Sequence, residues 1–254
     1  MNGIKIVDVN AESVETFGFY CSKNKADEGY RKKLDWLHHR FDEGLKIKLL
    51  QDEEGRDLGF IEYVPGEFAW RPVAAVDYFF IHCIVVMKRE NRETGYGSLL
   101  IKTCLADAKR AGMKGVAVVC SDGGWMANSQ LFLKNGFEWV ERRGRFDLLA
   151  NRLREAPLPY FLDWEAKLKQ YQGLHLLIAH QCPWHAKAVR DLKQTAEEAG
   201  LHLQITEIRD AESAQQSGSG FGVFALVYNG QLLADHYISS TRFRNILGKE
   251  LHLT

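Results

Sequence analysis

The sequence predicts a mixed α/β protein that is divided into two domains. The apolar stretch from Tyr78 to Met87 is typical of a strand covered on both faces, and a glycine turn after it leads into a helix from Ser98 to Arg110. A second strand–helix–strand pattern begins near Gly173 and closes with a hairpin around Asn229-Gly230. We expect a first domain over residues 1–153, a linker over 154–172 and a second domain over 173–254.

The composition argues against nucleic acid and membrane partners. The chain of 254 residues carries 33 basic and 33 acidic side chains, so it has no charge excess with which to follow a phosphate backbone. No apolar run approaches the roughly 20 residues that span a bilayer, and the residues after Met1 lack the apolar region of a signal peptide. We therefore expect a cytoplasmic protein. The oligomeric state is left open.

The five cysteines show neither a disulfide framework nor a metal site. Their number is odd, and no two of them are close in sequence. They are Cys21, Cys83, Cys104, Cys120 and Cys182. Three of them lie in apolar segments, where a thiol is usually a small buried hydrophobic group. We expect no bound metal.

The first domain is predicted to open with a strand, two helices and a hairpin. Residues Ile4–Val9 alternate as a strand does, and Gly29–Glu43 carries apolar side chains along one side of a helix. We expect another helix over Ala11–Asn24. The strands Leu45–Gln51 and Leu58–Val64 flank a charged turn that contains glycine, which is typical of a hairpin. Pro65–Pro72 is predicted to be a loop near a binding pocket or an apolar plug on the sheet.

The glycine turn has the features of an anion site. It reads Arg92-Glu93-Thr94-Gly95-Tyr96-Gly97 and stands between a buried strand and a helix. The first turn of a helix presents unpaired backbone N–H groups and the positive end of the helix dipole. Because glycine has no side chain, a phosphate can approach the backbone at Gly95 and Gly97, and Arg92 adds a positive charge. The pattern is neither a Rossmann fingerprint nor a Walker loop.

The segment after this helix continues the same domain. A buried strand over Lys114–Cys120 is followed by a turn, a short helix over Met126–Lys134 and a strand over Phe137–Val140. Phe146–Leu153 is predicted to be the last strand of the domain.

Two motifs make the first domain resemble the GNAT acetyltransferases. The glycine turn is similar to their R/Q-x-x-G-x-G/A signature, and Leu131 to Phe137 is similar to their F-Y-x-K-x-G-F segment. The motifs occur in the family's order, and the resemblance covers residues 1 to about 153. It implies an acetyl-CoA-dependent N-acetyltransferase with acetyl-CoA as co-substrate and an unidentified amine as acceptor.

The resemblance also implies where acetyl-CoA binds. The backbone of the strand end, opened by divergence from the strand at Lys114–Ser121, would pair with the pantetheine arm. An N–H near Val85 would polarise the thioester carbonyl, and the glycine loop would hold the diphosphate. The residues expected at this site are Ile84, Val85, Val86, Met87, Arg92, Glu93, Thr94, Gly95, Tyr96, Gly97, Ser98, Phe132 and Lys134.

The catalytic groups depart from the family pattern. Many GNAT enzymes carry a carboxylate on the strand before the glycine loop and a tyrosine that protonates the leaving thiolate, whereas this chain has no carboxylate over Tyr78–Met87 and has Phe132 at the tyrosine position. His82 is the preferred base because histidine titrates in the useful range. A hydrogen-bonded core histidine is the alternative, and Asp122 could equally be a turn residue. The candidate bases are His82, Asp77, Glu62 and Asp122.

The second domain resembles a thioredoxin or glutaredoxin fold. After a linker that starts with Pro157 and Pro159, we expect strand, helix, strand, helix, hairpin and helix in this order. The motif Gln181-Cys182-Pro183 follows the first strand, and Gln215–Gly220 is predicted to be a mobile loop. The pairing with a GNAT domain resembles the YoaP-type two-domain acetyltransferases. The expected elements are strands at Leu174–Ala179, Leu201–Ile208, Phe221–Tyr228 and Leu232–Tyr237, and helices at Ala186–Ala199 and Arg242–Leu247.

Cys182 is a candidate reactive thiol. It precedes a helix whose dipole would stabilise a thiolate, and His185, one turn on, could add positive charge. The alternative is a motif used only for packing. Two other functions therefore stay open beside acetyl transfer: a non-catalytic acyl-CoA-binding sensor, and a thiol-redox or thiol-binding protein that uses Cys182.

Overall fold

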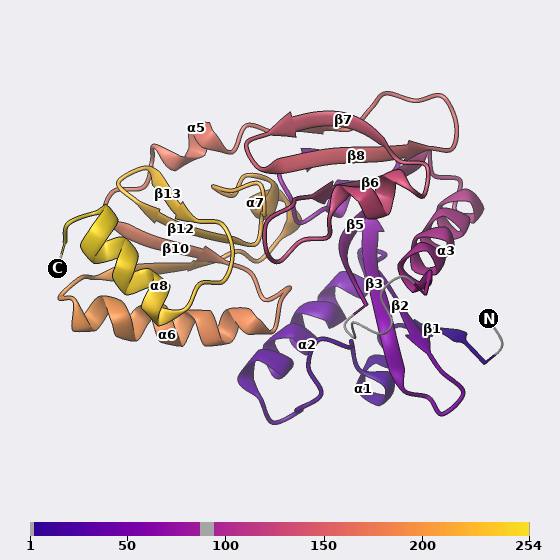
Figure 1. Ribbon diagram of the computed structural model, residues 1–254, viewed down its shortest axis with the longest axis horizontal. Coiled ribbons are helices and arrows are strands. Elements are labelled where there is room, and N and C mark those ends of the chain that lie inside the picture. The colour runs from indigo at the N-terminus through magenta and orange to yellow at the C-terminus, as the bar shows by residue number, and fades with distance from the viewer. Residues whose placement is uncertain (1–2, 87–93, 254) are drawn as a thin grey trace. The chain divides into compact units, whose positions relative to one another are not determined.

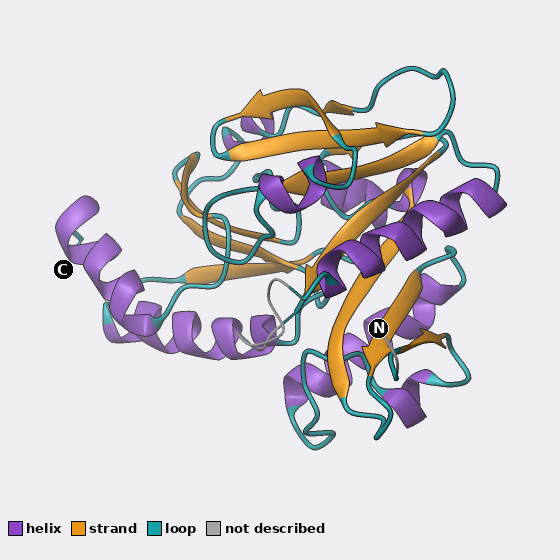
Figure 2. Ribbon diagram, turned by 45° about the vertical axis from the view of Figure 1, so that its right-hand side comes forward, coloured by secondary structure: helices purple, strands orange, loops and turns teal. Residues whose placement is uncertain are grey.

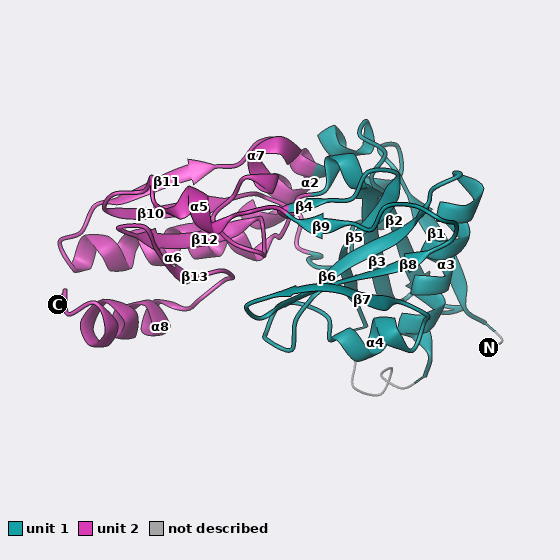
Figure 3. Cartoon of the chain, turned by 90° about the horizontal axis from the view of Figure 1, so that it is seen from above, with its two compact units in different colours: residues 1–23, 37–69, 73–161 teal, residues 24–36, 70–72, 162–254 magenta. Residues whose placement is uncertain are grey.

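The computed structural model describes residues 3–86 and 94–253, and the chain divides into two compact units (Figures 1 and 3). Unit 1 comprises residues 1–23, 37–69 and 73–161, and unit 2 comprises residues 24–36, 70–72 and 162–254. The second unit thus includes two short segments from the first third of the chain. Within the described ranges, no helix is long and apolar enough to cross a membrane.

The elements up to residue 161 follow the predicted order. They are β1 (Lys5–Val9), α1 (Val14–Phe17), α2 (Glu28–Phe41), β2 (Lys46–Gln51), β3 (Asp57–Pro65), the 3₁₀ turn η1 (Gly66–Phe68), β4 (Val73–Ala74), β5 (Tyr78–Val85), α3 (Tyr96–Arg110), β6 (Gly115–Cys120), α4 (Ser129–Leu133), β7 (Glu138–Arg143), β8 (Phe146–Arg152) and β9 (Tyr160–Phe161).

Unit 1 is built on a sheet of seven described strands in the order β1-β2-β3-β5-β6-β8-β7. Among these described strands only the central pair, β5 and β6, is parallel, and α3 provides the crossover between them. Side chains from α3 and α4, among them Leu100, Cys104 and Phe132, share one hydrophobic core with β5 and β6. Figure 2 distinguishes the helices in purple from the strands in orange. A small pairing of β4 with β9 was not predicted from the sequence, because each strand has only two residues.

A buried polar network joins α3 to this sheet. The Tyr63 hydroxyl donates a hydrogen bond to Asp107 Oδ2 over 2.5 Å, and Lys48 Nζ lies 2.9 Å from the same oxygen and 2.6 Å from Asp8 Oδ1. Burial raises the pKa of a carboxyl group, but the hydrogen bonds from Tyr63 and Lys48 and the charges of Lys48 and Arg110 hold the pKa of Asp107 below its ordinary value. The network therefore contains an ionised carboxylate inside the core.

Two predicted helices of unit 1 are shorter than expected. The helix expected over Ala11–Asn24 is confined to α1, because Gly18 and Tyr20 both have a positive φ, of 72° and 74°, which a right-handed helix cannot contain. The helix expected over Met126–Lys134 begins only at Ser129, where the Asn128 side chain accepts a hydrogen bond from the Gln130 N–H at 2.7 Å.

Unit 2 contains the predicted strand–helix–strand–helix–hairpin–helix order. Its four-stranded sheet has the order β11-β10-β12-β13, with β10 and β11 parallel and the other pairs antiparallel. The hairpin turn is confirmed at Asn229-Gly230, where both residues have positive φ. The elements are α5 (Glu165–Leu168), β10 (Leu174–Ile178), α6 (Trp184–Glu198), β11 (Leu203–Glu207), α7 (Ala211–Gln215), β12 (Phe224–Tyr228), β13 (Gln231–Ala234), α8 (Ser240–Asn245) and a closing π-helical turn (Ile246–Glu250).

The segment that was predicted to be a mobile loop is part of the core of unit 2. Ser217 and Ser219 are buried, and the Ser219 hydroxyl donates to the Phe224 carbonyl over 2.7 Å. A Cβ on Gly218 would lie 2.6 Å from a methyl group of Leu168. Small polar residues that look like a flexible linker in the sequence are here needed for close packing.

Candidate active site

A β-bulge in β5 brings together two of the predicted catalytic residues. The pairing of β3 with β5 passes from Glu62–Cys83 directly to Tyr63–Ile81, so His82 is the additional residue of the bulge. His82 Nδ1 lies 3.5 Å from Glu62 Oε1, and the two side chains are 0% and 2% exposed. The bulge thus turns the imidazole towards a carboxylate on the neighbouring strand.

The two parallel strands separate immediately beside this pair. β5 and β6 are hydrogen-bonded over Tyr78–Ile81 and Gly115–Val118. Beyond Ile81, β5 pairs only with β3 within the described residues, while β6 continues beside β8 to Cys120. The edge of β5 next to Ile84, Val85 and Val86 is the edge that the sequence predicted for the pantetheine arm.

The N-terminus of α3 follows this edge. Gly95 is the N-cap residue and has a left-handed backbone with φ of 85°, a conformation that glycine adopts without strain. The first turn, Tyr96 to Ser98, presents N–H groups that no residue of the helix can accept. A Cβ on Gly97 would lie 3.0 Å from a methyl group of Leu131, so glycine here also lets α3 pack closely on α4. Met87, Arg92 and Glu93 lie outside the described residues.

The other predicted residues lie apart from the bulge. Asp77 precedes β5 and forms an ion pair with Lys114 at 2.5 Å, five residues or about 16 Å of strand from His82. Asp122 is exposed and accepts a hydrogen bond from the Asn128 side chain at 2.8 Å, as expected of a turn residue. Phe132 is fully buried against Phe137, whereas Lys134 is exposed at the end of α4.

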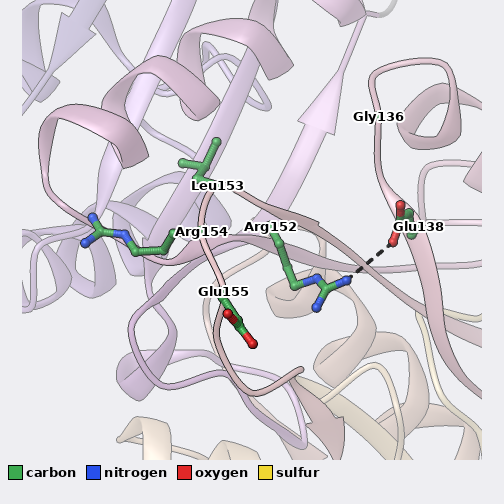
Figure 4. A pocket seen from close by; sticks show the side chains of 6 residues that line it. All are labelled: Gly136, Glu138, Arg152, Leu153, Arg154 and Glu155. Carbon is green, nitrogen blue, oxygen red and sulfur yellow. Dashed lines mark ion pairs between the residues drawn. The ribbon is translucent and has the colours of Figure 1, made fainter.

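A surface pocket of about 450 Å³ lies away from these residues. It is formed where β7 begins and β8 ends, and it contains the Arg152–Glu138 ion pair at 4.0 Å (Figure 4). Its charged side chains point to no particular reaction. The six lining residues are Gly136, Glu138, Arg152, Leu153, Arg154 and Glu155.

In unit 2, Cys182 is a partly exposed residue just before α6, but the predicted role of His185 is wrong. His185 is fully buried, and its Nδ1 donates to the Ala179 carbonyl at 2.6 Å. Burial lowers the pKa of His185 to about 4, so the ring is neutral near pH 7 and adds no positive charge beside the thiol. Among the described residues, no group of three acidic, histidine or cysteine side chains could hold a metal ion.

The buried His185 predicts a specific pH dependence of stability. Between pH 6.5 and about 4, the unfolded chain binds a proton at this imidazole while the folded chain does not, so the free energy of unfolding should fall by about 3 kcal/mol as the pH drops through this window. Urea unfolding at pH 7, 5.5 and 4 measures the loss. His185→Gln should remove this part of the slope, and His202→Gln, at an exposed histidine of the same unit, should not. An unchanged slope in His185→Gln contradicts the prediction.

The burial of Arg71 was not predicted from the sequence. Its side chain is buried in unit 2, where Nη1 donates to the side chain of Gln181 over 3.1 Å and the guanidinium lies 4.7 Å from the Phe221 ring centroid. The local sequence, a lone arginine between Trp70 and Pro72, gave no indication of this.

The comparison with known proteins identifies the family. The sequence profile of the acetyltransferase (GNAT) family matches residues 10–137, which is half of the chain. The chain belongs to the GNAT acetyltransferase family. The predictions of an N-acetyltransferase and of acetyl-CoA as its co-substrate are thereby confirmed. A YoaP-like profile matches residues 202–245 of this GNAT protein, and the likeness of the second unit to thioredoxin stays a prediction.

Individual relatives of this GNAT acetyltransferase are distant. The uncharacterized N-acetyltransferase YoaP of Bacillus subtilis (strain 168) is 25% identical over 249 residues, which cover 95% of this chain and 97% of that protein. Two solved structures have a TM-score of 0.43 each. The PaiA N-acetyltransferase of Thermoplasma acidophilum, in complex with coenzyme A, is 15% identical and covers 59% of this chain and 98% of its own. A putative acetyltransferase of Salmonella typhimurium, YncA with acetyl-CoA, is 16% identical. The match covers 63% of this chain and 99% of the YncA chain.

Proposed function

We propose that His82 is the general base with which this enzyme transfers the acetyl group of acetyl-CoA to an amine. The observation that carries the proposal is the buried His82–Glu62 pair at the bulge, beside the point where β5 and β6 separate. A carboxylate 3.5 Å from one ring nitrogen orients the imidazole and stabilises its protonated form. This arrangement replaces the strand carboxylate that many members of the family carry.

The reaction then needs no further acid. The neutral amine nitrogen attacks the thioester carbonyl carbon, and His82 accepts the proton that the nitrogen loses. As the tetrahedral intermediate collapses, the carbon–sulfur bond breaks and its electron pair leaves with the sulfur. The protonated His82 returns its proton to the thiolate, so that an amide and a free thiol are formed. Phe132 could not donate this proton, because its side chain carries no hydrogen-bonding group.

We infer that two features of the backbone would hold acetyl-CoA. The edge of β5 over Ile84–Val86 would pair with the pantetheine arm as a neighbouring strand does. The N–H groups of the first turn of α3 would bind the diphosphate, with favourable interaction from the dipole of this 15-residue helix. We place the reaction in the cytoplasm, and five cysteines that are all thiols agree with a reducing compartment.

Thr94 offers a test of the diphosphate site. Thr94→Asp puts a negative charge just before α3, which should favour the helix but repel the diphosphate, so the Kd for acetyl-CoA should rise at least tenfold without loss of thermal stability. Thr94→Asn is the uncharged control of the same size. Calorimetry with acetyl-CoA measures both. Equal affinities for the two variants would argue against a diphosphate at this helix end.

Turnover decides between an enzyme and a sensor. Release of free coenzyme A, followed with a thiol reagent in the presence of acetyl-CoA and a panel of primary amines, should identify at least one acceptor. Tight binding of acetyl-CoA without turnover across amines, peptides and a cell extract would instead favour the acyl-CoA-binding sensor.

A further inference from the structure

The helix α4 of unit 1 ends in a Schellman motif. The Phe137 N–H donates to the Phe132 carbonyl over 3.2 Å. The Gly136 N–H donates to the Leu133 carbonyl over 3.1 Å, and Gly136 has the positive φ, 79°, that this motif needs. The rings of Phe132 and Phe137 pack together across the motif with 5.4 Å between centroids. The residue that precedes Gly136, which is Asn135, is therefore held in one backbone conformation.

The backbone of Asn135 is also held from the sheet. The Nδ2 group of Asn151, on β8, donates to the carbonyls of Asn135 and Gly136 over 3.2 and 2.8 Å. Asn151 is itself placed by the pairing of β8 with β6, where it lies opposite Val116. The side chain of Asn135 thus extends from a backbone that is fixed on two sides.

The groups around the Asn135 side chain determine the orientation of its amide. Nδ2 lies 2.8 Å from the Leu131 carbonyl oxygen, which can only accept a hydrogen bond, so the NH₂ group of the amide faces this oxygen. The same nitrogen lies 3.0 Å from Ser98 Oγ, in the first turn of α3. Because an amide nitrogen only donates, the Ser98 oxygen accepts this bond.

This bond leaves the hydrogen of the Ser98 hydroxyl available for another group. A serine hydroxyl has one hydrogen and two lone pairs, and Asn135 occupies one lone pair. In helices such a hydroxyl often donates to the carbonyl four residues earlier, as that of Thr103 does to Leu99 over 2.9 Å. Within residues 3–86 and 94–253, no group accepts a hydrogen bond from the Ser98 hydroxyl. This hydrogen can therefore be donated to a ligand.

The Ser98 hydroxyl lies where the diphosphate is expected to bind. Ser98 is the third residue of α3, and the Leu99 N–H donates to the Gly95 carbonyl over 2.9 Å, so the helical hydrogen bonds begin one residue after Ser98. Side chains of a helix lean towards its N-terminus, which places the hydroxyl beside the same first turn. An anion here can accept from backbone N–H groups and from this hydroxyl.

We propose that Asn135 positions the Ser98 hydroxyl to donate a hydrogen bond to the diphosphate of acetyl-CoA. The proposal rests on the function proposed above, which places the diphosphate at the first turn of α3. Asn135 anchors the oxygen of Ser98 and touches neither the diphosphate nor the reacting atoms, so it is a positioning residue. A hydroxyl that is already held in one rotamer loses less entropy when the ligand binds.

Ser98→Ala removes the proposed donor. Loss of a hydrogen bond to a charged group should raise the Kd for acetyl-CoA about tenfold or more, which calorimetry measures. A comparison of coenzyme A with 3′-dephospho-CoA, which keeps the diphosphate but lacks the phosphate on the ribose, tells which anion is bound. Ser98→Ala should weaken both ligands by the same factor. A loss confined to coenzyme A would assign the hydroxyl to the ribose phosphate and overturn the proposal.

Asn135→Leu tests whether Asn135 acts through Ser98. The backbone bonds that end α4 do not use this side chain, so the variant should fold. The Kd for acetyl-CoA should rise about three- to tenfold in the parent background but less than about 1.5-fold in the Ser98→Ala background. In kinetics, the KM for acetyl-CoA should rise with kcat unchanged, because the diphosphate is bound equally in the ground and transition states. Equal effects of Asn135→Leu in both backgrounds would refute the positioning role.

The matched control lies at the other end of α4. Asn128→Ala removes the cap bond from the Gln130 N–H, at 2.7 Å, and so disturbs the same helix without touching Ser98. It should leave the Kd and the KM for acetyl-CoA as in the parent. A loss of affinity as large as that of Asn135→Leu would show that any loosening of α4 weakens binding, and the proposal would then fail.

Thr94→Asp separates this proposal from the proposed function. If both Thr94→Asp and Ser98→Ala leave the Kd for acetyl-CoA unchanged, the diphosphate does not bind at this helix end and both proposals fail. If Thr94→Asp weakens binding and Ser98→Ala does not, the diphosphate site stands and only the role of Ser98 and Asn135 is refuted. Both results come from calorimetry, so they hold even if no amine acceptor has been found.

Discussion

Replacement of His82 by glutamine is expected to lower the turnover of acetyl-CoA with an amine by roughly 100- to 10,000-fold, the range of a lost general base. Glutamine retains much of the size of the imidazole and can hydrogen-bond to Glu62, but it cannot take up a proton near neutral pH. The Kd for acetyl-CoA should stay within about twofold of the parent, because the strand edge and α3 are untouched. Steady-state kinetics with an amine found by the panel screen, together with calorimetry, separates these two effects.

Two further variants make the His82 experiment specific. Glu62→Gln should reduce turnover less than His82→Gln, since the carboxylate acts only through the imidazole. Cys83→Ser changes the next residue of the same bulge and should leave turnover near the parent value, which controls for disturbance of the strand. Full activity of a folded His82→Gln protein would mean that the histidine is a hydrogen-bonded core residue, the alternative that the sequence left open.

Replacement of Asp107 by leucine is expected to lower the free energy of unfolding by about 3–5 kcal/mol. The change leaves the buried Tyr63 hydroxyl without the carboxylate that accepts its hydrogen bond, and it takes from the Lys48 ammonium the buried one of its two carboxylate contacts, the other being the exposed Asp8. Loss of the buried partner of a buried charge is strongly destabilising. Because the pKa of Asp107 lies below its ordinary value, its contribution is also lost in the parent as the pH falls below about 4. Urea unfolding of the parent and the variant at pH 7 measures the loss.

A paired replacement separates charge from packing at this site. Lys48→Met combined with Asp107→Leu removes both buried charges, so it should recover a large part of the stability lost in Asp107→Leu. Asp52→Ala removes the carboxylate that pairs with the exposed Arg56 side chain on the hairpin and should be far less destabilising than Asp107→Leu. If Asp107→Leu is no more destabilising than Asp52→Ala, the network contributes little to stability.

The sequence determined the order of the elements and the place where acetyl-CoA is expected to bind. Apolar runs marked β5, β6 and β10, the Asn229-Gly230 turn marked a hairpin, and glycine after a buried strand marked the start of α3. These features depend on residues close together in the chain, whose backbone preferences and burial patterns are expressed wherever the segment folds. The two motifs of the family lie in the same short segments, and for this reason the family could be predicted without a structure.

Contacts between distant residues decided the rest. His82 and Glu62 are 20 positions apart and meet only because β5 has one residue more than β3 at the bulge, which no local pattern indicates. Burial made His185 neutral, although a surface position at a helix start would have left it able to carry a charge. The division of α2 between the two units, and the packing of its first turn on Pro183, likewise depend on segments more than 150 residues apart. Local sequence sets what a segment prefers to be, whereas register, burial and charge state are set by what the finished fold places beside it.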